Sequence, residues 1–454
     1  MGRIFGTDGA RGIAGTELSC ELAMKIGRAA AYVLTKHFSQ RPMILIGRDT
    51  RISSKMLESA LIAGICSVGS DTTSIGVVPT PAVAFLVGHY HCEAGIMISA
   101  SHNPVEYNGI KIFNGDGYKL SDELEEEVER YVLDCPDEIP LKTGCDLGRS
   151  FARRSAVNDY IAHLVDTVDG DLRGMRIAVD CANGSASATA EQLFRSLGAV
   201  PMIIHAEPDG TNINDHCGST HLEDLQKFVK THHCMGGVAF DGDADRCLAV
   251  DENGELIDGD QMIAIFAREW RERGVLTGNT AVVTVMSNLG FFLFAQQEGI
   301  AVEKTKVGDR YVLEHMKKNH YVLGGEQSGH IIFHDFATTG DGQLSAIQLL
   351  SILQKKDCPL SVLASCMERF PQVLVNVSAS AEQKRQFETS EHLAELIARE
   401  DQKLGNTGRV LVRASGTEPI IRVMLEGQKL DEITYLANAI ANEIQRVIGA
   451  VETI

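Results

Sequence analysis

The sequence is poor in aromatic residues and in long apolar stretches. Aromatic residues make up 6% of the 454 residues, and there is one tryptophan. No apolar run approaches the roughly 20 residues that a membrane-spanning helix needs, and the first residues lack the apolar core of a signal peptide. Eleven cysteines occur without a Cys-x-x-Cys pair, which is typical of reduced thiols. We therefore expect a cytoplasmic protein that does not enter a membrane.

Basic residues are also scarce relative to acidic ones. The chain has 42 Lys and Arg against 61 Asp and Glu, which gives a net charge of −19. This balance argues against a nucleic-acid or anionic-membrane partner. If the substrate is a phosphate ester, several basic side chains must converge on one place in an otherwise acidic protein.

Helix-like and strand-like segments alternate along most of the chain, which predicts an α/β fold. At a typical ~150 residues per domain, the length indicates three or four domains. Residues 134–154 contain two prolines and two glycines with little periodicity and so form a plausible domain junction. Near the end, strands at 408–413 and 420–426 between helices at 382–402 and 431–448 predict a smaller α+β domain.

One turn carries a serine in the position of a nucleophile. The apolar run Ala94–Ile98 predicts a buried strand, and Pro104 forbids its regular continuation. Ser101 therefore lies on a loop at the carboxyl end of a strand, where α/β proteins usually place their chemistry. We expect its hydroxyl to be exposed. Serine is a weak nucleophile, so other segments must supply groups that stabilise the charge developing during attack.

A second turn, Asp-Gly-Asp-Ala-Asp-Arg at 241–246, places three carboxylates at alternate positions directly after an apolar segment. Oxygen ligands of this kind suit Mg²⁺, which keeps open positions for phosphate oxygens. The spacing resembles the start of an EF-hand loop, but Arg246 stands where that loop requires glycine. The alternative is a solvated acidic turn in which aspartate bonds its own backbone. We favour metal binding.

Two further turns offer groups for a sugar phosphate. Residues 324–330, Gly-Gly-Glu-Gln-Ser-Gly-His, could bond a polyol, although a plain polar turn is the simpler interpretation of this motif taken alone. Residues 413–419, Arg-Ala-Ser-Gly-Thr-Glu-Pro, together with Arg422, could hold a phosphate dianion or form a surface turn. No Walker loop is present.

Other motifs are weaker. Histidine and cysteine cluster at 89–92 and at His216, Cys217 and His221, but neither cluster completes the four-ligand spacing of a zinc site. The glycine-rich start at 5–12 contains Arg11 and by itself indicates only a turn. These segments acquire meaning only in combination.

In combination, the motifs resemble the α-D-phosphohexomutase superfamily. The matching segments follow the superfamily's order and cover nearly the whole chain: residues 5–12, 99–104, 241–246, 325–330 and 413–419. The resemblance implies an α/β fold with three similar mixed α/β domains and a C-terminal α+β domain around a central cleft. We expect the phosphoserine, metal-loop, sugar-binding and phosphate-binding domains at residues 1–150, 151–253, 254–368 and 369–454, respectively.

The resemblance also implies a role for each matching residue. One Mg²⁺ per subunit would be held by Ser101, Asp241, Asp243 and Asp245. The catalytic group would be Ser101 (carried as phosphoserine), Lys111 (an acid/base candidate), His102, Arg11 and Arg246. The substrate-binding group would be Asn103, Gly308, Asp309, Glu326, Ser328, His330, Arg413, Ser415, Gly416, Thr417 and Arg422. Ala414 stands where the superfamily often has lysine, which removes a charge beside the phosphate-binding turn.

Gln327 and the segments 212–221 and 307–312 look like the glucosamine-phosphate branch of the superfamily. The resemblance then implies interconversion of glucosamine 6-phosphate and glucosamine 1-phosphate through a sugar 1,6-bisphosphate, which also serves as activator, for UDP-N-acetylglucosamine synthesis. The alternatives are a phosphomannomutase or phosphoglucomutase, and a metal-dependent sugar phosphatase. The expected partner is a small phosphosugar, with neither nucleic acid nor membrane, and the expected assembly is a monomer or homodimer.

Overall fold

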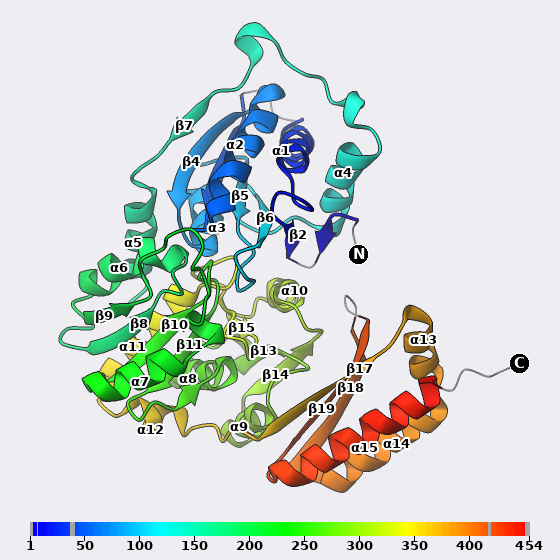
Figure 1. Ribbon diagram of the computed structural model, residues 1–454. Helices are drawn as coiled ribbons and strands as arrows, with labels where there is room; N and C mark the ends of the chain where they lie inside the picture. The colour runs from blue at the N-terminus through cyan, green and yellow to red at the C-terminus, as the bar shows by residue number, and fades with distance from the viewer. Residues whose placement is uncertain (1–2, 7, 37–40, 416–418, 450–454) are drawn as a thin grey trace, which may run out of the picture. The chain divides into compact units, whose positions relative to one another are not determined.

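The computed structural model describes residues 3–6, 8–36, 41–415 and 419–449 (Figure 1). By contacts, the chain divides into two compact units. One comprises Met1–Met286 with Gly299–Cys366, and the other Ser287–Glu298 with Met367–Ile454. We describe each unit by itself.

The first unit begins with a seven-stranded mixed sheet in the order β1-β2-β6-β5-β3-β4-β7. Its strands are β1 (Phe5–Gly6), β2 (Gly9–Ile13), β3 (Met43–Arg48), β4 (Asp71–Val77), β5 (Ala94–Ile98), β6 (Tyr107–Asn114) and β7 (Ser150–Ala152). Its helices are α1 (Cys20–Thr35), α2 (Ile52–Ser67), α3 (Thr80–His89) and α4 (Asp122–Leu133), followed by the short 3₁₀ turns η1 (Pro136–Glu138) and η2 (Gly144–Asp146).

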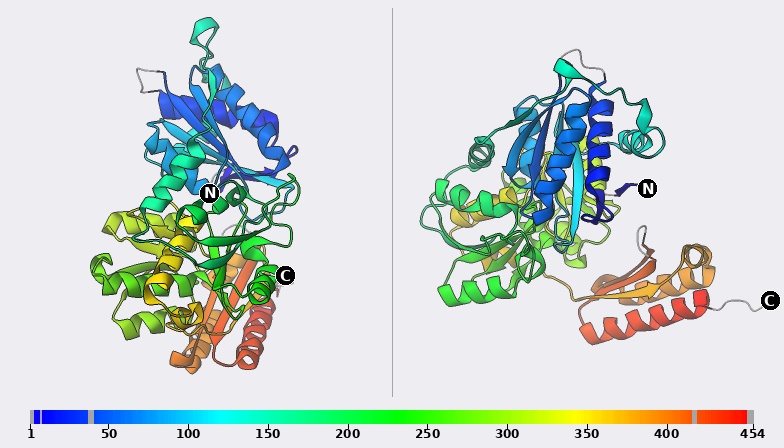
Figure 2. Two further views of the ribbon diagram at one scale, coloured as in Figure 1. Left: turned by 90° about the vertical axis from the view of Figure 1, so that its left-hand side faces the viewer. Right: turned by 45° about the horizontal axis from the view of Figure 1, so that its top comes forward.

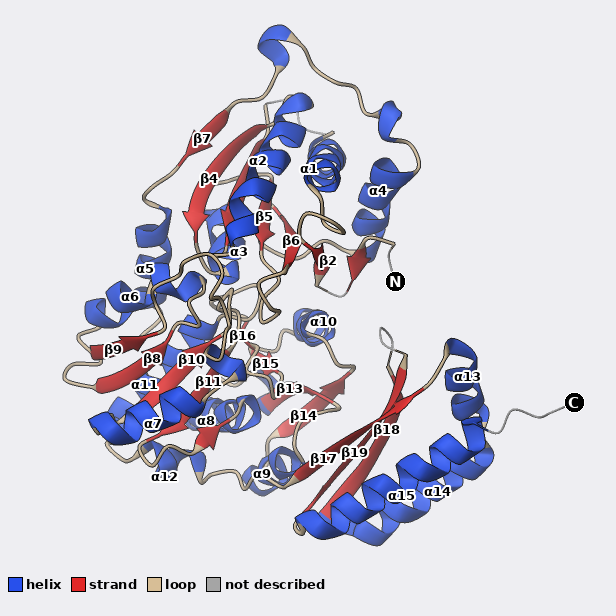
Figure 3. Cartoon of the chain, in the orientation of Figure 1, coloured by secondary structure: helices blue, strands red, loops and turns tan. Residues whose placement is uncertain are grey.

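Helices cover both faces of this sheet, as the blue ribbons of Figure 3 show. Helices α1, α2 and α4 share a core with inward residues of the central strands, such as Ile44 and Ile96. Helix α3 packs on β3 and β5. Every residue of β5 is buried, because a strand with both faces covered must be apolar along its whole length. The predicted buried strand before Ser101 is therefore confirmed.

The second sheet has five strands in the order β12-β11-β10-β8-β9. Its strands are β8 (Arg176–Asp180), β9 (Val200–Ile204), β10 (Gly236–Phe240), β11 (Cys247–Asp251) and β12 (Leu256–Ile257). Its helical elements are α5 (Ala156–Asp166), η3 (Ser185–Ala188), α6 (Ala190–Ser196), η4 (Gly218–Thr220) and α7 (Glu223–His232).

The third sheet has four strands in the order β14-β13-β15-β16. Its strands are β13 (Thr280–Thr284), β14 (Ala301–Thr305), β15 (Leu323–Gly325) and β16 (Ile331–Phe333). The accompanying helical elements are α8 (Gly259–Glu272), η5 (Thr277–Asn279), α10 (Asp309–Asn319), α11 (Gly342–Lys356) and α12 (Leu360–Ala364).

The three sheets share one topology. In each, the first strand of the motif pairs in parallel with the second and the third, and the fourth pairs antiparallel with the third. The four strands in chain order are β3, β4, β5 and β6 in the first sheet, β8 to β11 in the second, and β13 to β16 in the third. The prediction of three similar mixed α/β domains is confirmed by this repetition.

The second unit contains a three-stranded antiparallel sheet in the order β17-β19-β18. Its elements are α9 (Leu289–Glu298), β17 (Gln372–Ser378), α13 (Ala381–Thr389), α14 (Glu391–Leu404), η6 (Gly405–Thr407), β18 (Gly408–Ala414), β19 (Ile420–Gly427) and α15 (Leu430–Gly449). Helix α14 packs on β18, and α15 packs on β17 and β19 (Figure 1 and Figure 2). The sheet and these helices share one apolar core.

Two details of this unit differ from the sequence prediction. The single helix expected at 382–402 is two helices, because Ser390 ends α13 and caps α14 by accepting from the amide of Leu393. Strand β17 was not predicted, although Val373, Val375 and Val377 alternate toward the core as a half-buried strand requires.

The α/β class is confirmed. The predicted domain boundaries and the central cleft stay predictions. Among the described helices, none combines the length and the apolar composition of a bilayer-crossing segment.

Candidate active site

Three topologically equivalent turns carry the motifs of the first unit. Each connects the third strand of the shared four-strand motif to the antiparallel fourth. We call them the serine turn (residues 99–106, after β5), the aspartate turn (241–246, after β10) and the glutamate turn (326–330, after β15). The carboxyl end of the third strand therefore presents chemistry in all three domains.

The serine turn meets the aspartate turn directly. The Oγ of Ser101 donates to Oδ2 of Asp241 at 2.5 Å, and Nδ1 of His102 lies 3.2 Å from the same Oγ. Ser101 is 1% exposed, so the prediction of an exposed hydroxyl was wrong. The aspartate turn covers the hydroxyl, and a Cβ at Gly242 would lie 2.5 Å from the carbonyl oxygen of Ser101. Only glycine permits so close an approach of the two turns.

The three carboxylates of the aspartate turn form a buried cluster suited to a cation. Their ligand oxygens lie within 4.8 Å of one another, and Asp241 and Asp243 are fully buried. Burial and the neighbouring charges of Asp245 and Asp243 raise the pKa of Asp241 to about 8. Oδ1 of Asp243 and Oδ1 of Asp245 are buried and accept no hydrogen bond from a described residue. Crowded, partly unsatisfied oxygens of this type fit a hard divalent ion such as Mg²⁺.

Lys111, on β6, balances part of this negative charge. Its Nζ lies 2.8 Å from Asp243, 3.1 Å from Asp8 and 3.3 Å from Asp245. Burial by itself lowers the pKa of Lys111, but these carboxylates outweigh it and hold the pKa well above its usual value. In this arrangement the ammonium is a fixed positive charge among three carboxylates.

Asp8 and Lys119 extend the charge network, and sequence reasoning missed both. The Nζ of Lys119 lies 2.6 Å from Asp8 and 2.6 Å from Asp309, which joins the first domain to the third. Asp8 also bonds Arg11. Asp8 belongs to the motif at 5–12 and could have been included on that ground, whereas no local signal distinguishes Lys119 from other lysines.

The backbone of the glutamate turn is hydrogen-bonded to Gly259 and Cys247, but one of its side chains has no described hydrogen-bond partner. The amide of Gly308 donates to Glu326 at 2.9 Å, so these two predicted residues do meet. The hydroxyl of Ser328 is buried and has no hydrogen-bond partner among the described residues. His330 accepts from the amide of Gly340 at 3.0 Å, and its Nδ1 lies 3.7 Å from Asp245.

Two arginines, Arg11 and Arg246, bring positive charge to the serine and aspartate turns. Nη1 of Arg11 donates to Asn103 at 3.4 Å, and Nε of Arg246 lies 3.9 Å from Asp245. Burial, with Arg246 and Arg11 as charged neighbours, lowers the pKa of His102 to about 4. The imidazole beside Ser101 is therefore neutral at neutral pH.

The C-terminal unit places its two predicted arginines opposite each other. Arg413 on β18 pairs across the antiparallel ladder with Arg422 on β19. Like charges directly opposite in a sheet are unfavourable, and a bound phosphate between them would offset the repulsion. Ser415 is 6% exposed, and Lys384 on α13 donates to its carbonyl at 2.6 Å. Lys384 thus brings a charge that Ala414 lacks. Gly416 and Thr417 lie outside the described residues.

Comparisons with known proteins agree with this arrangement. The chain matches the families described as "Phosphoglucomutase/phosphomannomutase, alpha/beta/alpha domain I" at residues 2–135, domain II at 158–254, domain III at 258–370 and the C-terminal domain at 374–443. A phosphoglucosamine mutase from Acetivibrio thermocellus is 52% identical over 99% of this chain and 100% of its own length. The chain belongs to the phosphoglucosamine mutase family.

Phosphoglucosamine mutases are phosphohexomutases, so the chain is an isomerase. Solved structures share the fold. A phosphoglucomutase/phosphomannomutase family protein from Burkholderia thailandensis has a TM-score of 0.82 at 23% identity, with 98% of both chains covered. An Aspergillus fumigatus N-acetylphosphoglucosamine mutase, in complex with GlcNAc-6P and magnesium, has a TM-score of 0.63 at 18% identity, covering 94% of this chain and 99% of that one.

Proposed function

We propose that this phosphoglucosamine mutase interconverts glucosamine 6-phosphate and glucosamine 1-phosphate through phosphoserine at Ser101 and a sugar 1,6-bisphosphate. The observation that carries the proposal is the 2.5 Å contact between Oγ of Ser101 and the buried aspartate turn. A hydroxyl beside three carboxylates that can hold a cation is a suitable carrier for a phosphoryl group.

The aspartate turn would hold Mg²⁺ through Asp241, Asp243 and Asp245, with an oxygen at Ser101 completing the protein ligands. When bound, the ion neutralises phosphoryl charge. Lys111, Arg11 and Arg246 add positive charge around the same group, and Lys111 can give a proton to the serine oxygen when the phosphoryl group leaves it. Phosphoryl transfer depends mainly on such positioning and charge, which the cluster provides.

Balanced chemistry takes two transfers. In the first, the bond from phosphorus to the Ser101 oxygen breaks and this oxygen takes a proton from Lys111, while a sugar hydroxyl gains the phosphoryl group and its proton passes to the Lys111 amine. The resulting bisphosphate turns over, and its other phosphate returns to Ser101. Asn103, Gly308, Asp309, Glu326, Ser328 and His330 would bind the sugar. Arg413, Ser415, Gly416, Thr417 and Arg422 would hold the phosphate that is not reacting.

Amino-sugar preference rests on Gln327 in the glutamate turn and on the curated relatives, whose name is phosphoglucosamine mutase. The product would enter UDP-N-acetylglucosamine synthesis. We also assign the enzyme to the cytoplasm, because no disulfide bond forms among the described cysteines, as in a reducing compartment. A monomer or homodimer stays a prediction.

A substrate panel tests the proposal. The value of kcat/KM should be highest for glucosamine 6-phosphate when the 6-phosphates of glucosamine, glucose and mannose are compared with catalytic sugar 1,6-bisphosphate present. A preference for glucose or mannose 6-phosphate would establish the related mutase activities instead. Stoichiometric release of inorganic phosphate without isomerisation would establish a phosphatase.

A further inference from the structure

A buried arginine outside all the sequence motifs donates hydrogen bonds to the backbone of the serine turn. Arg51, just before α2, is 1% exposed. Its Nη2 donates to the carbonyl oxygens of Ser101 and Asn103, both at 2.9 Å, and its Nη1 donates to that of Pro104 at 2.8 Å. One planar guanidinium thus fixes three carbonyls of the turn.

A chain of hydrogen bonds through Ser99 and Asp49 links the amide of Ser101 to the same arginine. It donates to Oγ of Ser99 at 3.0 Å, and Ser99 donates to Oδ2 of Asp49 at 2.7 Å. Asp49 also accepts from Nε of Arg51 at 2.9 Å. Because Asp49 is fully buried, this ion pair is a rigid support in the first domain.

The second domain also donates hydrogen bonds to the serine turn, through Asn214. Nδ2 of Asn214 donates to the carbonyls of Ser101 at 2.9 Å and Asn103 at 3.2 Å, the same two oxygens that Arg51 bonds. A Cβ at Gly242 would come within 2.8 Å of this amide nitrogen. Asn214, Arg51 and the aspartate turn therefore converge on one carbonyl.

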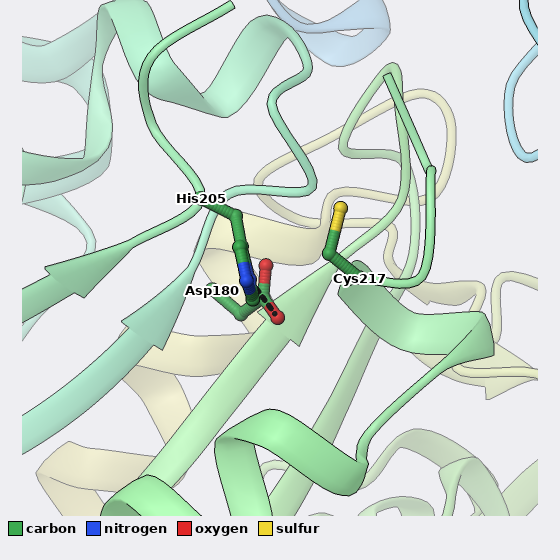
Figure 4. A group of neighbouring side chains, drawn as sticks. All are labelled: Asp180, His205 and Cys217. Atoms are coloured by element: carbon green, nitrogen blue, oxygen red, sulfur yellow. Dashed lines mark hydrogen bonds and ion pairs between the residues drawn. The ribbon is translucent and has the colours of Figure 1, made fainter. Parts of the chain in front are cut away.

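Asp180 hydrogen-bonds the residues on either side of the loop that carries Asn214, residues 206–217. Oδ2 of Asp180 accepts from Nδ1 of His205 at 3.0 Å (Figure 4). The same oxygen accepts from the amide of Gly218 at 3.0 Å. Cys217 lies beside this pair, and its sulfur is within 4.8 Å of a ring nitrogen of His205 and a carboxylate oxygen of Asp180. Since Oδ1 of Asp180 also accepts from the amide of Ala182, we interpret the group as a hydrogen-bonded fastening and not as a zinc site.

Ser101 needs such support because its φ is +52°, in the left-handed region that side chains other than glycine avoid. We propose that Arg51 and Asn214 are positioning residues that together hold Ser101 in this conformation, which directs its Oγ toward Asp241. This role rests on the proposed function, since it is the phosphoryl-carrying hydroxyl that is positioned. A turn held by only one domain could relax and withdraw the hydroxyl.

Asn214→Ala is the main test, because it removes two hydrogen bonds and no charge. Asn212→Ala is the matched control, since the Asn212 side chain bonds only within its own loop. For Asn214→Ala we expect kcat to fall about 10-fold with KM for the sugar phosphate within twofold. Phosphorylation of Ser101 by sugar bisphosphate, followed by intact mass, should slow by the same factor. Both quantities should stay at the wild-type level in Asn212→Ala.

Arg51→Lys provides a second variant, which keeps the charge but cannot bond three carbonyls at once. It should lower kcat more than KM, as Asn214→Ala does. A kcat within twofold of wild type in Asn214→Ala, or equal losses in Asn214→Ala and Asn212→Ala, would overturn the positioning role. A crystal structure of Asn214→Ala in which Ser101 keeps its left-handed φ would also overturn it, whatever the activity. Failure of the wild type to accept phosphate at Ser101 would instead defeat the proposed function.

Discussion

The serine turn and the glutamate turn occupy equivalent places in their sheets, but the hydroxyl groups of the two turns differ in their hydrogen bonding. In the serine turn, Arg51 and Asn214 bond the carbonyls, and the reactive hydroxyl is buried against Asp241. In the glutamate turn, residues 326–328 are only partly buried, and the hydroxyl of Ser328 has no partner among the described residues. Under the proposed function the difference is expected, because a reacting group must be fixed in advance, whereas a group that recognises the sugar must keep a hydrogen-bonding atom available for it.

The largest expected effect is the loss of the fixed group. Ser101→Ala should lower kcat by on the order of 10⁴-fold or more, because it removes the oxygen proposed to carry the phosphoryl group, and the hydroxyl of Thr80, which also bonds the aspartate cluster, contacts Asp243 and not Asp241. The melting temperature should move by only about 3 °C, since one hydroxyl is removed without a cavity larger than an oxygen atom. Steady-state kinetics and thermal denaturation check both statements. Robust turnover by the variant would contradict the nucleophile assignment.

The aspartate turn should show the next largest effect. Asp243→Asn removes one buried negative charge from the cluster and leaves Lys111 with two carboxylates. We expect the affinity for Mg²⁺, measured by titration calorimetry, to fall at least about 100-fold. Asp215→Asn, the same change on an exposed side chain, is the control and should bind Mg²⁺ as the wild type does. Equal affinities in the two variants would argue against a metal site here.

Arg413 and Arg422, which face each other in the C-terminal sheet, extend the comparison to the proposed phosphate-binding site. Arg422→Ala should raise KM for the sugar phosphate about 10- to 100-fold, because a charge-assisted contact is worth ~1.5–3 kcal/mol. The exposed Arg446 on α15 offers a control, Arg446→Ala. Initial rates across a range of substrate concentrations distinguish the two. A KM unchanged from wild type would remove Arg422 from the phosphate site.

Ser328→Ala tests the recognition turn. The variant lacks a hydroxyl that can form a hydrogen bond to the sugar. We therefore expect KM to rise about 3- to 10-fold and kcat to stay within twofold. This signature is the reverse of that expected for Ser101→Ala. A fall in kcat without a change in KM would show that the two turns are not specialised as described.

The smallest expected effect concerns the hydrogen bond between His205 and Asp180, at the start of the loop that carries Asn214. The hydrogen bond to Asp180 is the main cause that raises the pKa of His205, and Asp224 adds to it. A raised folded pKa stabilises the protein fully below the unfolded value of ~6.5, and this contribution disappears as pH rises through the folded value. The difference in unfolding free energy between wild type and His205→Asn should therefore shrink from pH 5.5 to pH 8.5, pH values chosen to span ~6.5 on both sides. A difference independent of pH, measured by urea denaturation, would contradict this linkage.

Much of the fold could be predicted because its signals are local. Strand β5 was evident from its unbroken apolar run, and helix α15 from the helix-like segment at 431–448. The break at Ser390 was missed because helix-forming residues continue on both sides of it. The candidate site was found from turn chemistry, but Lys119 and Arg51 were missed because each resembles any surface cation until its partners are known.

By itself, the sequence determined which chemistry each turn could offer, since strand ends, turn residues and ligand types are written in neighbouring positions. It also determined family membership, because several such turns occur in one order. Only the tertiary structure decided that Ser101 is buried, that its carbonyl is shared by Arg51 and Asn214, and that Lys119 joins Asp8 to Asp309. These contacts link residues far apart in the chain, so they depend on how whole sheets pack and not on any local pattern.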